Sequence, residues 1–238
     1  MQRELTLKGS FPEYLTLLER SVPLHIIRNP RARRYLLRLN SNFSVRLTVP
    51  RGGSLAEAHA FLHRNIPWLE RSAERLAKRP TLPKQWSPGT KIYWRGELVT
   101  IEQNDQDRFV RFADQTVLLR ENEDFRVALE HHIWRLAAKE LPPLVFHYAQ
   151  LHGLTVRRVT IRNQRSRWGS CSRRGVISLN WRILQAPALV RDYLILHELM
   201  HLREMNHSRR FWAQVASVCP EYQTADAWLS QYSHLLGR

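Results

Sequence analysis

The stretch HELMHLREMNH, residues 197 to 207, brings three histidines and a glutamate close together in the sequence. His197 and His201 are four residues apart, so on a helix they lie one turn apart on one face, where two imidazoles can reach the same zinc ion. Glu198 lies beside them and is placed to act as general base for water activated by such a metal. The pattern H-E-x-x-H also arises by chance in a chain with 11 histidines, so its surroundings matter.

The helix that carries these residues is almost entirely apolar. Between Tyr193 and Leu202 the only ionisable side chains are His197, Glu198 and His201, and every other position is Leu, Ile or Met. Most faces of such a helix must be buried, and a buried unpaired carboxylate is costly unless it becomes neutral. A metal cation satisfies all three groups at once. In the alternative interpretation, the histidines bond to backbone carbonyls and the glutamate reaches the surface.

Three residues are candidates for a third metal ligand. His207 follows His201 by six residues, across a loop short enough to turn it back past the helix end. Glu221 lies twenty residues after His201, a spacing suited to zinc peptidases that take a glutamate from the next helix. Cys171 would complete a Cys-His-His set, as in peptide deformylases. We favour His207; in the competing interpretation it only flanks the following helix.

The spacing H-E-x-x-H-x-x-x-x-x-H also matches the metzincin proteases, but two departures exclude that family. Glu204 stands where metzincins need a turn glycine. Metzincins also need a methionine turn downstream, and the chain has no methionine after Met205.

The sequence before the histidine helix predicts a long helix and two strands. The helical pattern at 125–152 is expected to be interrupted near Pro142-Pro143 and to end at Gly153. A strand at 156–163 alternates between an apolar and a polar face. A second strand follows a turn at 173–175, and its polar face consists of Ser178, Asn180 and Arg182. A new helix is expected at Ser208, and a last helix closes the chain.

The N-terminal part is predicted to be rich in strands, with one helix. Two strands are joined by the turn Asn40-Ser41-Asn42. Ser54 and Glu57 form a capping box at the start of the helix, which Pro67 kinks or divides. The turn-rich segment 79–90 is a candidate boundary, and further short strands follow it.

The chain is strongly basic. It has 37 Lys and Arg against 21 Asp and Glu, a net charge of +16 and a pI near 10.9. Two stretches, 28–51 and 157–182, hold seven and eight arginines and no acidic residue. Such a surface is either a solvated basic face or a footprint for nucleic acid or another polyanion. Composition alone does not separate these two interpretations.

The compartment is expected to be the cytoplasm. Two cysteines, Cys171 and Cys219, do not make a disulfide framework. The N-terminus lacks the apolar segment of a secretory signal, and no stretch approaches the roughly 18 uncharged apolar residues of a membrane-spanning helix. We therefore expect no membrane partner.

The sequence RSRWGSCSRRGVISLNWRIL, followed by HELMHLREMNHSRRFW, resembles the YgjP-like family of bacterial zinc-metallopeptidase domains, relatives of the SprT/WLM group. RRYLLRL…VRLTVPRG near the N-terminus and PEY…WL near the C-terminus also resemble that family, so the similarity covers most of the chain. The resemblance implies a zinc ion (Zn2+) held by His197, His201 and His207, with Glu198 as general base. The chain departs from the family at none of these four positions.

The expected fold class is α+β. The resemblance implies a zincin-like core at residues 121–238, in which a small antiparallel or mixed sheet packs on the central HExxH helix. A β-rich N-terminal accessory region with one helix is expected at residues 1–120. The strand before the HExxH helix is expected to lie along the substrate cleft.

The expected reaction is hydrolysis of a peptide bond in a peptide or protein substrate. The polar face of Ser178, Asn180 and Arg182, or the edge of that strand, can hold an extended peptide by strand addition. Trp168 and Trp181 are assigned to the core, and Cys171 has no separate histidine partner to make it a nucleophile. Four residues are candidate donors to the oxyanion: Arg167, Tyr222, Tyr232 and His234.

Two other functions fit parts of the sequence. A metal-dependent nuclease is the first, because a bacterial family of zinc endoribonucleases has the same three-histidine spacing, but with a glycine in place of Glu198. The second is a nucleic-acid-binding protein with a structural zinc, although such sites usually have four protein ligands. A fourth ligand from Cys171 would favour it. A protease that acts on proteins held on DNA or RNA combines both kinds of function.

Overall fold

A computed structural model describes residues 5–6, 11–40, 42–78, 85–104, 108–164 and 167–236 of the chain. Ser41 of the predicted turn and residues 79–84 of the turn-rich segment lie outside the described residues. The chain forms two compact units, Met1–Pro80 and Thr81–Arg238. We call them the N-terminal and C-terminal units. No helix of the described residues is long and apolar enough to cross a membrane.

The boundary between the units lies within the turn-rich segment and not at residue 120. The strands between Lys91 and Leu118, which the sequence analysis assigned to the N-terminal region, belong to the C-terminal unit. The physical reason is burial: side chains such as Trp94 and Phe112 pack into the same core as the long helix that follows. A role for residues 1–120 as an accessory region stays a prediction.

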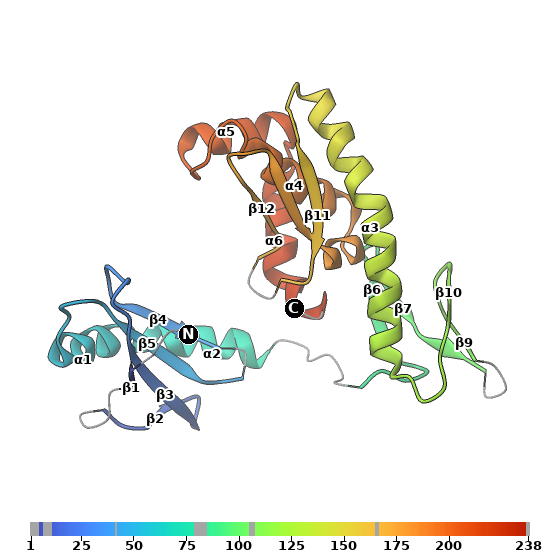
Figure 1. The fold of residues 1–238 in the computed structure, drawn as a ribbon. Coiled ribbons are helices and arrows are strands. Elements are labelled where there is room, and N and C mark those ends of the chain that lie inside the picture. The colour runs from blue at the N-terminus through green and yellow to red at the C-terminus, as the bar shows by residue number, and fades with distance from the viewer. Residues whose placement is uncertain are drawn as a thin grey trace. The chain divides into compact units, whose positions relative to one another are not determined.

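The N-terminal unit is a sheet covered by two helices (Figure 1). Ser54 and Glu57 form the predicted capping box, and the helix divides at Asn65, just before Pro67, as expected. The unit has its own core, in which Leu47 and Leu69 are fully buried. Its elements are β1 (Leu5–Thr6), β2 (Tyr14–Leu17), β3 (Arg20–Arg28), β4 (Leu36–Leu39), β5 (Val45–Val49), α1 (Leu55–Arg64) and α2 (Ile66–Ala77). The sheet order is β1-β3-β5-β4, with β2 paired to β3.

The C-terminal unit begins with short antiparallel strands in two small sheets and continues with helices around a further three-stranded sheet (Figure 1). The first part contains β6 (Lys91–Trp94), β7 (Glu97–Thr100), β8 (Glu102–Gln103), β9 (Phe109–Phe112) and β10 (Gln115–Leu118). The second part contains α3 (Phe125–Leu151), β11 (Arg158–Arg162), β12 (Gly169–Cys171), β13 (Val176–Asn180), α4 (Ala188–Met200), α5 (Arg209–Val218) and α6 (Tyr222–Tyr232). Two 3-10 helices, η1 (Trp181–Gln185) and η2 (Ser233–Leu236), complete it. The α+β class is confirmed.

The long helix α3 is not interrupted at Pro142-Pro143, so that prediction was wrong. A proline inside a helix removes a backbone hydrogen bond and crowds the preceding turn, which costs about 3 kcal/mol. Packing offsets this cost, because Ala137, Leu141 and Val145 form a fully buried stripe on both sides of the prolines. The helix bends part-way along its length (Figure 1).

The small sheet has the order β11-β13-β12, with β11 parallel and β12 antiparallel to β13. Its inner face, which includes the fully buried Ile177 and Leu179, packs with α3 and α4 into one core. Within the described residues β12 pairs with β13 alone, so it is an edge strand. The sheet therefore places β12 beside the helix that carries the histidines (Figure 1).

The second predicted strand ends earlier than expected. It stops at Asn180, and residues 181–185 form η1, because the Asn180 side chain accepts a hydrogen bond from the backbone N–H of Arg182 (3.1 Å) and caps the 3-10 helix. Trp181 is buried as predicted, and Ile183 is buried too, but both lie in η1 and not in a strand. Alternation of apolar and polar residues continued past the end of the strand and gave no sign of the turn.

Candidate metal centre

Helix α4 presents two of the three histidines at its C-terminal end. Eight of its residues are buried, as the apolar pattern predicted. His197 lies in the last turn, and His201 is the C-cap residue. The chain then turns through residues 202–207, and Ser208 caps α5 by accepting a hydrogen bond from the backbone N–H of Phe211 (3.3 Å). This cap fixes where α5 starts and so brings His207 back to the end of α4.

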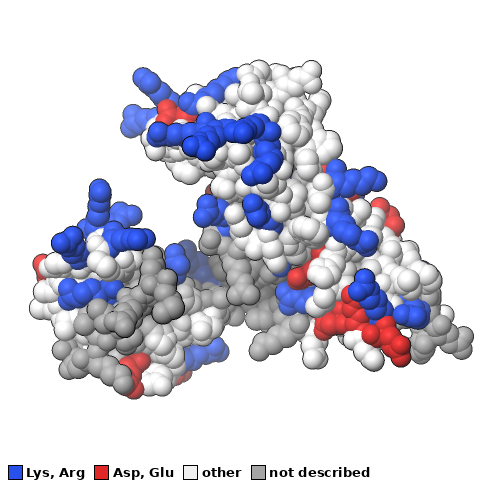
Figure 2. All heavy atoms as spheres, in the orientation of Figure 1, with Lys and Arg blue, Asp and Glu red and all other residues white. Residues whose placement is uncertain are grey.

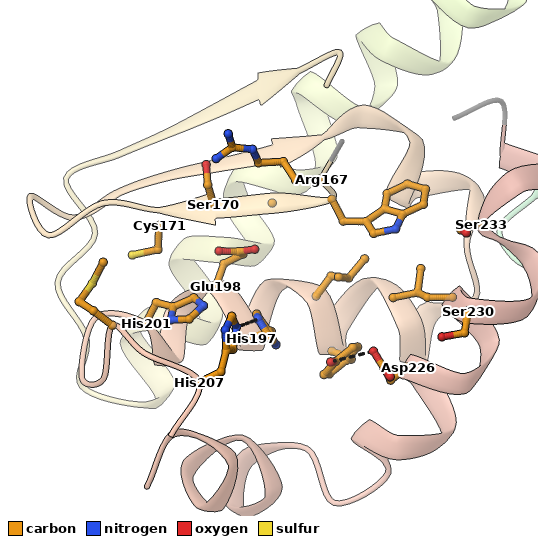
Figure 3. A pocket seen from close by; sticks show the side chains of 16 residues that line it. Arg167, Ser170, Cys171, His197, Glu198, His201, His207, Asp226, Ser230 and Ser233 are labelled. Atoms are coloured by element: carbon orange, nitrogen blue, oxygen red, sulfur yellow. Dashed lines mark hydrogen bonds between the residues drawn. The ribbon is translucent and has the colours of Figure 1, made fainter. Parts of the chain in front are cut away.

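The three histidines converge on one point. Ring nitrogens of His197, His201 and His207 all lie within 4.8 Å of one another, and the two Nε2 atoms of His197 and His207 are 3.0 Å apart (Figure 3). The sequence analysis predicted that these three histidines would lie together. Of the other two candidate ligands, Cys171 lines the same cavity but is not part of this group of nitrogens, and Glu221 does not line the cavity.

The surroundings of His197 and His201 favour the neutral form of both rings. Burial, with the neighbouring His201 and His207, lowers the pKa of His197 to about 4. Burial also lowers the pKa of His201, against the effect of a hydrogen bond between its Nδ1 and the carbonyl of Glu204 (3.1 Å). The ring of Phe211 stacks on His201, with centroids 4.4 Å apart. Neutral imidazole is the form that binds metals.

This donor set fits a zinc ion. Three converging imidazoles supply one ligand fewer than a structural zinc site usually has, which is the ligand number of catalytic zinc sites. The bond from His201 Nδ1 to the Glu204 carbonyl leaves Nε2 for the metal and fixes the ring, as the outer partners of metal-binding histidines do.

Glu198 is buried directly beside the histidines, with 6% of its surface exposed. Burial raises the pKa of Glu198 to about 8, while the nearby Arg167 opposes this shift. The backbone of β12 packs on this carboxylate: a Cβ added to Gly169 would lie 2.6 Å from Glu198 Cγ and 2.7 Å from Cδ. The sequence analysis did not single out Gly169, whose requirement arises from this tertiary contact.

A cavity of about 580 Å³ opens onto the histidines and Glu198. Arg167 and Trp168 line it at the sheet, and a second group of polar residues lines it from the other side (Figure 3). This second group, Tyr193, Asp226, Ser230 and Ser233, was missed by sequence reasoning as part of the site. Of the four candidate donors to the oxyanion, only Arg167 lines the cavity.

Comparison with protein-family models identifies the family of this chain. A family model described as "YgjP-like, metallopeptidase domain" matches residues 33–232. The chain belongs to the YgjP-like metallopeptidase domain family. No curated protein matches this YgjP-like chain. One solved structure that matches is the crystal structure of the metallopeptidase zymogen of Pyrococcus abyssi abylysin, with 26% identity and a TM-score of 0.35, over 39% of this chain and 94% of that chain.

The residues predicted to hold the substrate do not line the cavity of this YgjP-like chain. Asn180 is fully buried, and its Nδ2 donates to the carbonyl of Gln164 (2.7 Å). Arg182 is buried, bonds to Asn163 and pairs with Glu130 (3.5 Å). Both side chains are therefore held within the protein and are not free to bind a peptide.

Ser178 lies on the outer face of the sheet, where its hydroxyl bonds to that of Thr160 (2.8 Å). The predicted strand addition to β13 is also excluded, because β13 pairs with a neighbour on each side. The strand with a free edge next to the cavity is β12. The predicted polar substrate face was wrong because it assumed one continuous, solvent-exposed strand.

The remaining assignments concern Trp168, Trp181 and Cys171. Trp181 is buried in the core as predicted, whereas Trp168 packs partly on the core and also lines the cavity. Burial and the charge of Glu198 raise the pKa of Cys171 to about 11. Cys171 is therefore a neutral thiol at pH 7, which is a weak nucleophile and a weak metal ligand.

Proposed function

We propose that this chain is a zinc-dependent metallopeptidase, in which His197, His201 and His207 hold the zinc ion and Glu198 is the general base. The observation that carries the proposal is the convergence of three imidazoles beside a buried carboxylate at one end of a cavity. Membership of a metallopeptidase domain family supports it. The packing of the small sheet on α4 supports the expected zincin-like arrangement of the core.

Each group of the site has a separate role in the proposed reaction. When bound, zinc supplies Lewis acidity that makes water more acidic and a carbonyl more reactive. Glu198 takes the proton of the attacking water and delivers it to the leaving amine. Burial makes its carboxylate a stronger base than an exposed one. We assign the donor to the oxyanion to Arg167, because it lines the cavity and its charge acts on Glu198.

Two rival functions are less well supported. A nuclease that relies on the metal alone has no need of a carboxylate buried against the histidines, yet β12 is packed around Glu198. A structural zinc usually takes four protein ligands, and in the described part of the chain the group that can hold a metal has three.

Zinc content and peptide hydrolysis test the proposal. We expect one zinc per chain in the wild type and much less in His207→Ala, with Glu221→Ala unchanged as the control. We expect Glu198→Gln to keep its zinc and to lose peptide hydrolysis by about 10²–10⁴-fold, the usual size of a general-base effect. Full zinc in His207→Ala would overturn the ligand set, and undiminished activity in Glu198→Gln would overturn the mechanism.

A role near nucleic acid is the second candidate, and one feature favours it. Arg158 and Arg162 are exposed on β11, on the side of the sheet opposite the core, on either side of Thr160. Figure 2 shows Lys and Arg side chains gathered at the upper end of the C-terminal unit, whereas Asp and Glu side chains gather at its lower end. A basic face on the C-terminal unit would hold the enzyme on a polyanion while it cleaves a bound protein.

Salt dependence tests this second role. Binding of single-stranded or duplex DNA or RNA should weaken steeply as salt rises, and replacing both Arg158 and Arg162 with alanine should reduce the slope by about two. Binding that does not respond to salt or to these substitutions would exclude the role.

A further inference from the structure

The end of the cavity away from the histidines carries a single carboxylate. Asp226, on α6, accepts a hydrogen bond from the hydroxyl of Tyr193 (3.5 Å), and Ser230 and Ser233 lie on the same side of the cavity (Figure 3). Tyr193 links the two ends, because its ring also packs edge-on against His197, with centroids 5.7 Å apart. The carboxylate of Asp226 therefore lies about one tyrosine side chain away from the proposed metal.

The cavity also has an apolar lining. Leu194 and Leu229, both largely buried, and the indole of Trp168 contribute to its wall. A ligand that fits an apolar wall and reaches a carboxylate needs an apolar stem and a positively charged tip. Lysine and arginine side chains have this form.

Asp226 is an acidic residue in a strongly basic chain. The chain has a net charge of +16, yet within the described residues no basic side chain forms an ion pair with Asp226. Among the described residues that line the cavity, Arg167 is the basic residue apart from the three histidines, and its charge acts on Glu198. One carboxylate oxygen of Asp226 accepts from Tyr193, and the second is left for a ligand.

We infer that Asp226, with the hydroxyls of Ser230 and Ser233, selects substrates that carry lysine or arginine next to the scissile bond. The inference rests on the proposed function and names its substrate class. An ammonium group has three donors, which match one carboxylate and two hydroxyl acceptors. Tyr193 is a positioning residue, because its hydroxyl holds the carboxylate of Asp226 toward the cavity while its ring supports His197.

Two peptides measure the contribution of the positive charge on the substrate. The two peptides differ only at the residue next to the cleaved bond, lysine in one and norleucine in the other, so the apolar stem is kept and the ammonium is removed. The cleaved bond is first located by mass spectrometry, with the zinc-loaded full chain acting on a mixed peptide library. We expect wild type to cleave the lysine peptide with a kcat/KM at least about ten-fold higher, the size of one charge-assisted contact.

Variants then assign the preference to Asp226. Asp226→Asn should remove most of the preference for lysine, measured as the ratio of kcat/KM for the two peptides. Asp226→Lys should reverse it toward an acidic residue. Glu97→Gln, which removes an exposed carboxylate elsewhere on the same unit, is the matched control and should keep the wild-type preference.

The outcomes separate the two proposals. Cleavage without a preference for basic residues, or a preference that survives in Asp226→Asn, would overturn the inference and leave the peptidase intact. No cleavage of any peptide by the zinc-loaded chain would overturn the proposed function and the inference with it. Because Asp226 is exposed on α6, its variants should fold, which circular dichroism checks.

Discussion

Replacing Gly169 with alanine should remove activity without removing the metal. The added methyl group would lie 2.6 Å from Glu198 Cγ and 2.7 Å from Cδ, whereas carbon atoms in contact are about 3.5–4.0 Å apart. Glu198 or β12 must therefore move by about 1 Å. The backbone of Gly169 does not have a positive φ, so the effect of alanine is steric alone.

The expected loss follows from this displacement. A misplacement of about 1 Å at a catalytic group costs about 10²-fold in rate, or about 2.7 kcal/mol of transition-state stabilisation. Overpacking should also lower the free energy of unfolding, by about 1–3 kcal/mol. Zinc content should stay at the wild-type level, because the histidines come from α4 and the loop after it, not from β12.

The assay compares kcat/KM on one peptide, zinc per chain and the free energy of unfolding. The control is Gly153→Ala at the end of α3, where a Cβ has no atom within 4 Å but φ is +62°. It should lower stability by about 1 kcal/mol and leave the activity of the folded enzyme unchanged. If Gly169→Ala kept its activity within two-fold, the contact with β12 would not be what holds the general base in place.

Three further predictions follow from the described contacts. In the metal-free protein, burial raises the pKa of Glu198 to about 8. Between about pH 6.5 and 8, the folded chain therefore holds a proton on Glu198 that the unfolded chain has already lost. The free energy of unfolding should fall as pH rises through this range. The loss should be about 2 kcal/mol, measured by denaturant unfolding, and should vanish in Glu198→Gln. Below about pH 6.5 the pKa of His197, lowered to about 4 mainly by burial, acts in the opposite direction, since stability due to this residue rises with pH. Arg182→Ala should lower the free energy of unfolding by about 3 kcal/mol, because Glu130 and Asn163 lose a buried partner. It should leave substrate preference unchanged. An altered preference with normal stability would show that Arg182 is a substrate-binding residue after all. Pro143→Ala, at an exposed position of α3, should raise the free energy of unfolding by about 1–3 kcal/mol in urea titration, and an unchanged or lower value would show that the bend of α3 depends on that proline.

The sequence was most informative where local spacing decides the structure. His197, Glu198 and His201 could be placed on one buried helix because an apolar run of helical length leaves few arrangements for three ionisable side chains. His207 could be added because the loop after the helix is short. The capping box at Ser54 and the division of the helix before Pro67 are local in the same sense.

The other residues of the cavity depend on contacts between distant parts of the chain. Asp226 lies 28 residues after Glu198, and only the packing of α6 against α4 brings it to the cavity. Gly169 is required because β12 is an edge strand packed on α4. Asn180 and Arg182 have the polar character of a binding face, but their partners, Gln164 and Glu130, come from segments that the strand pattern did not connect.

The end of α4 at His201 has a consequence for the apo protein. A metal held by His201 and His207 would close the segment between them into a loop, much as a reversible disulfide does, and would remove conformational freedom from it. Metal binding and ordering of this loop are then coupled, so that each one favours the other. Substitutions in the loop would change the affinity for zinc without touching a ligand.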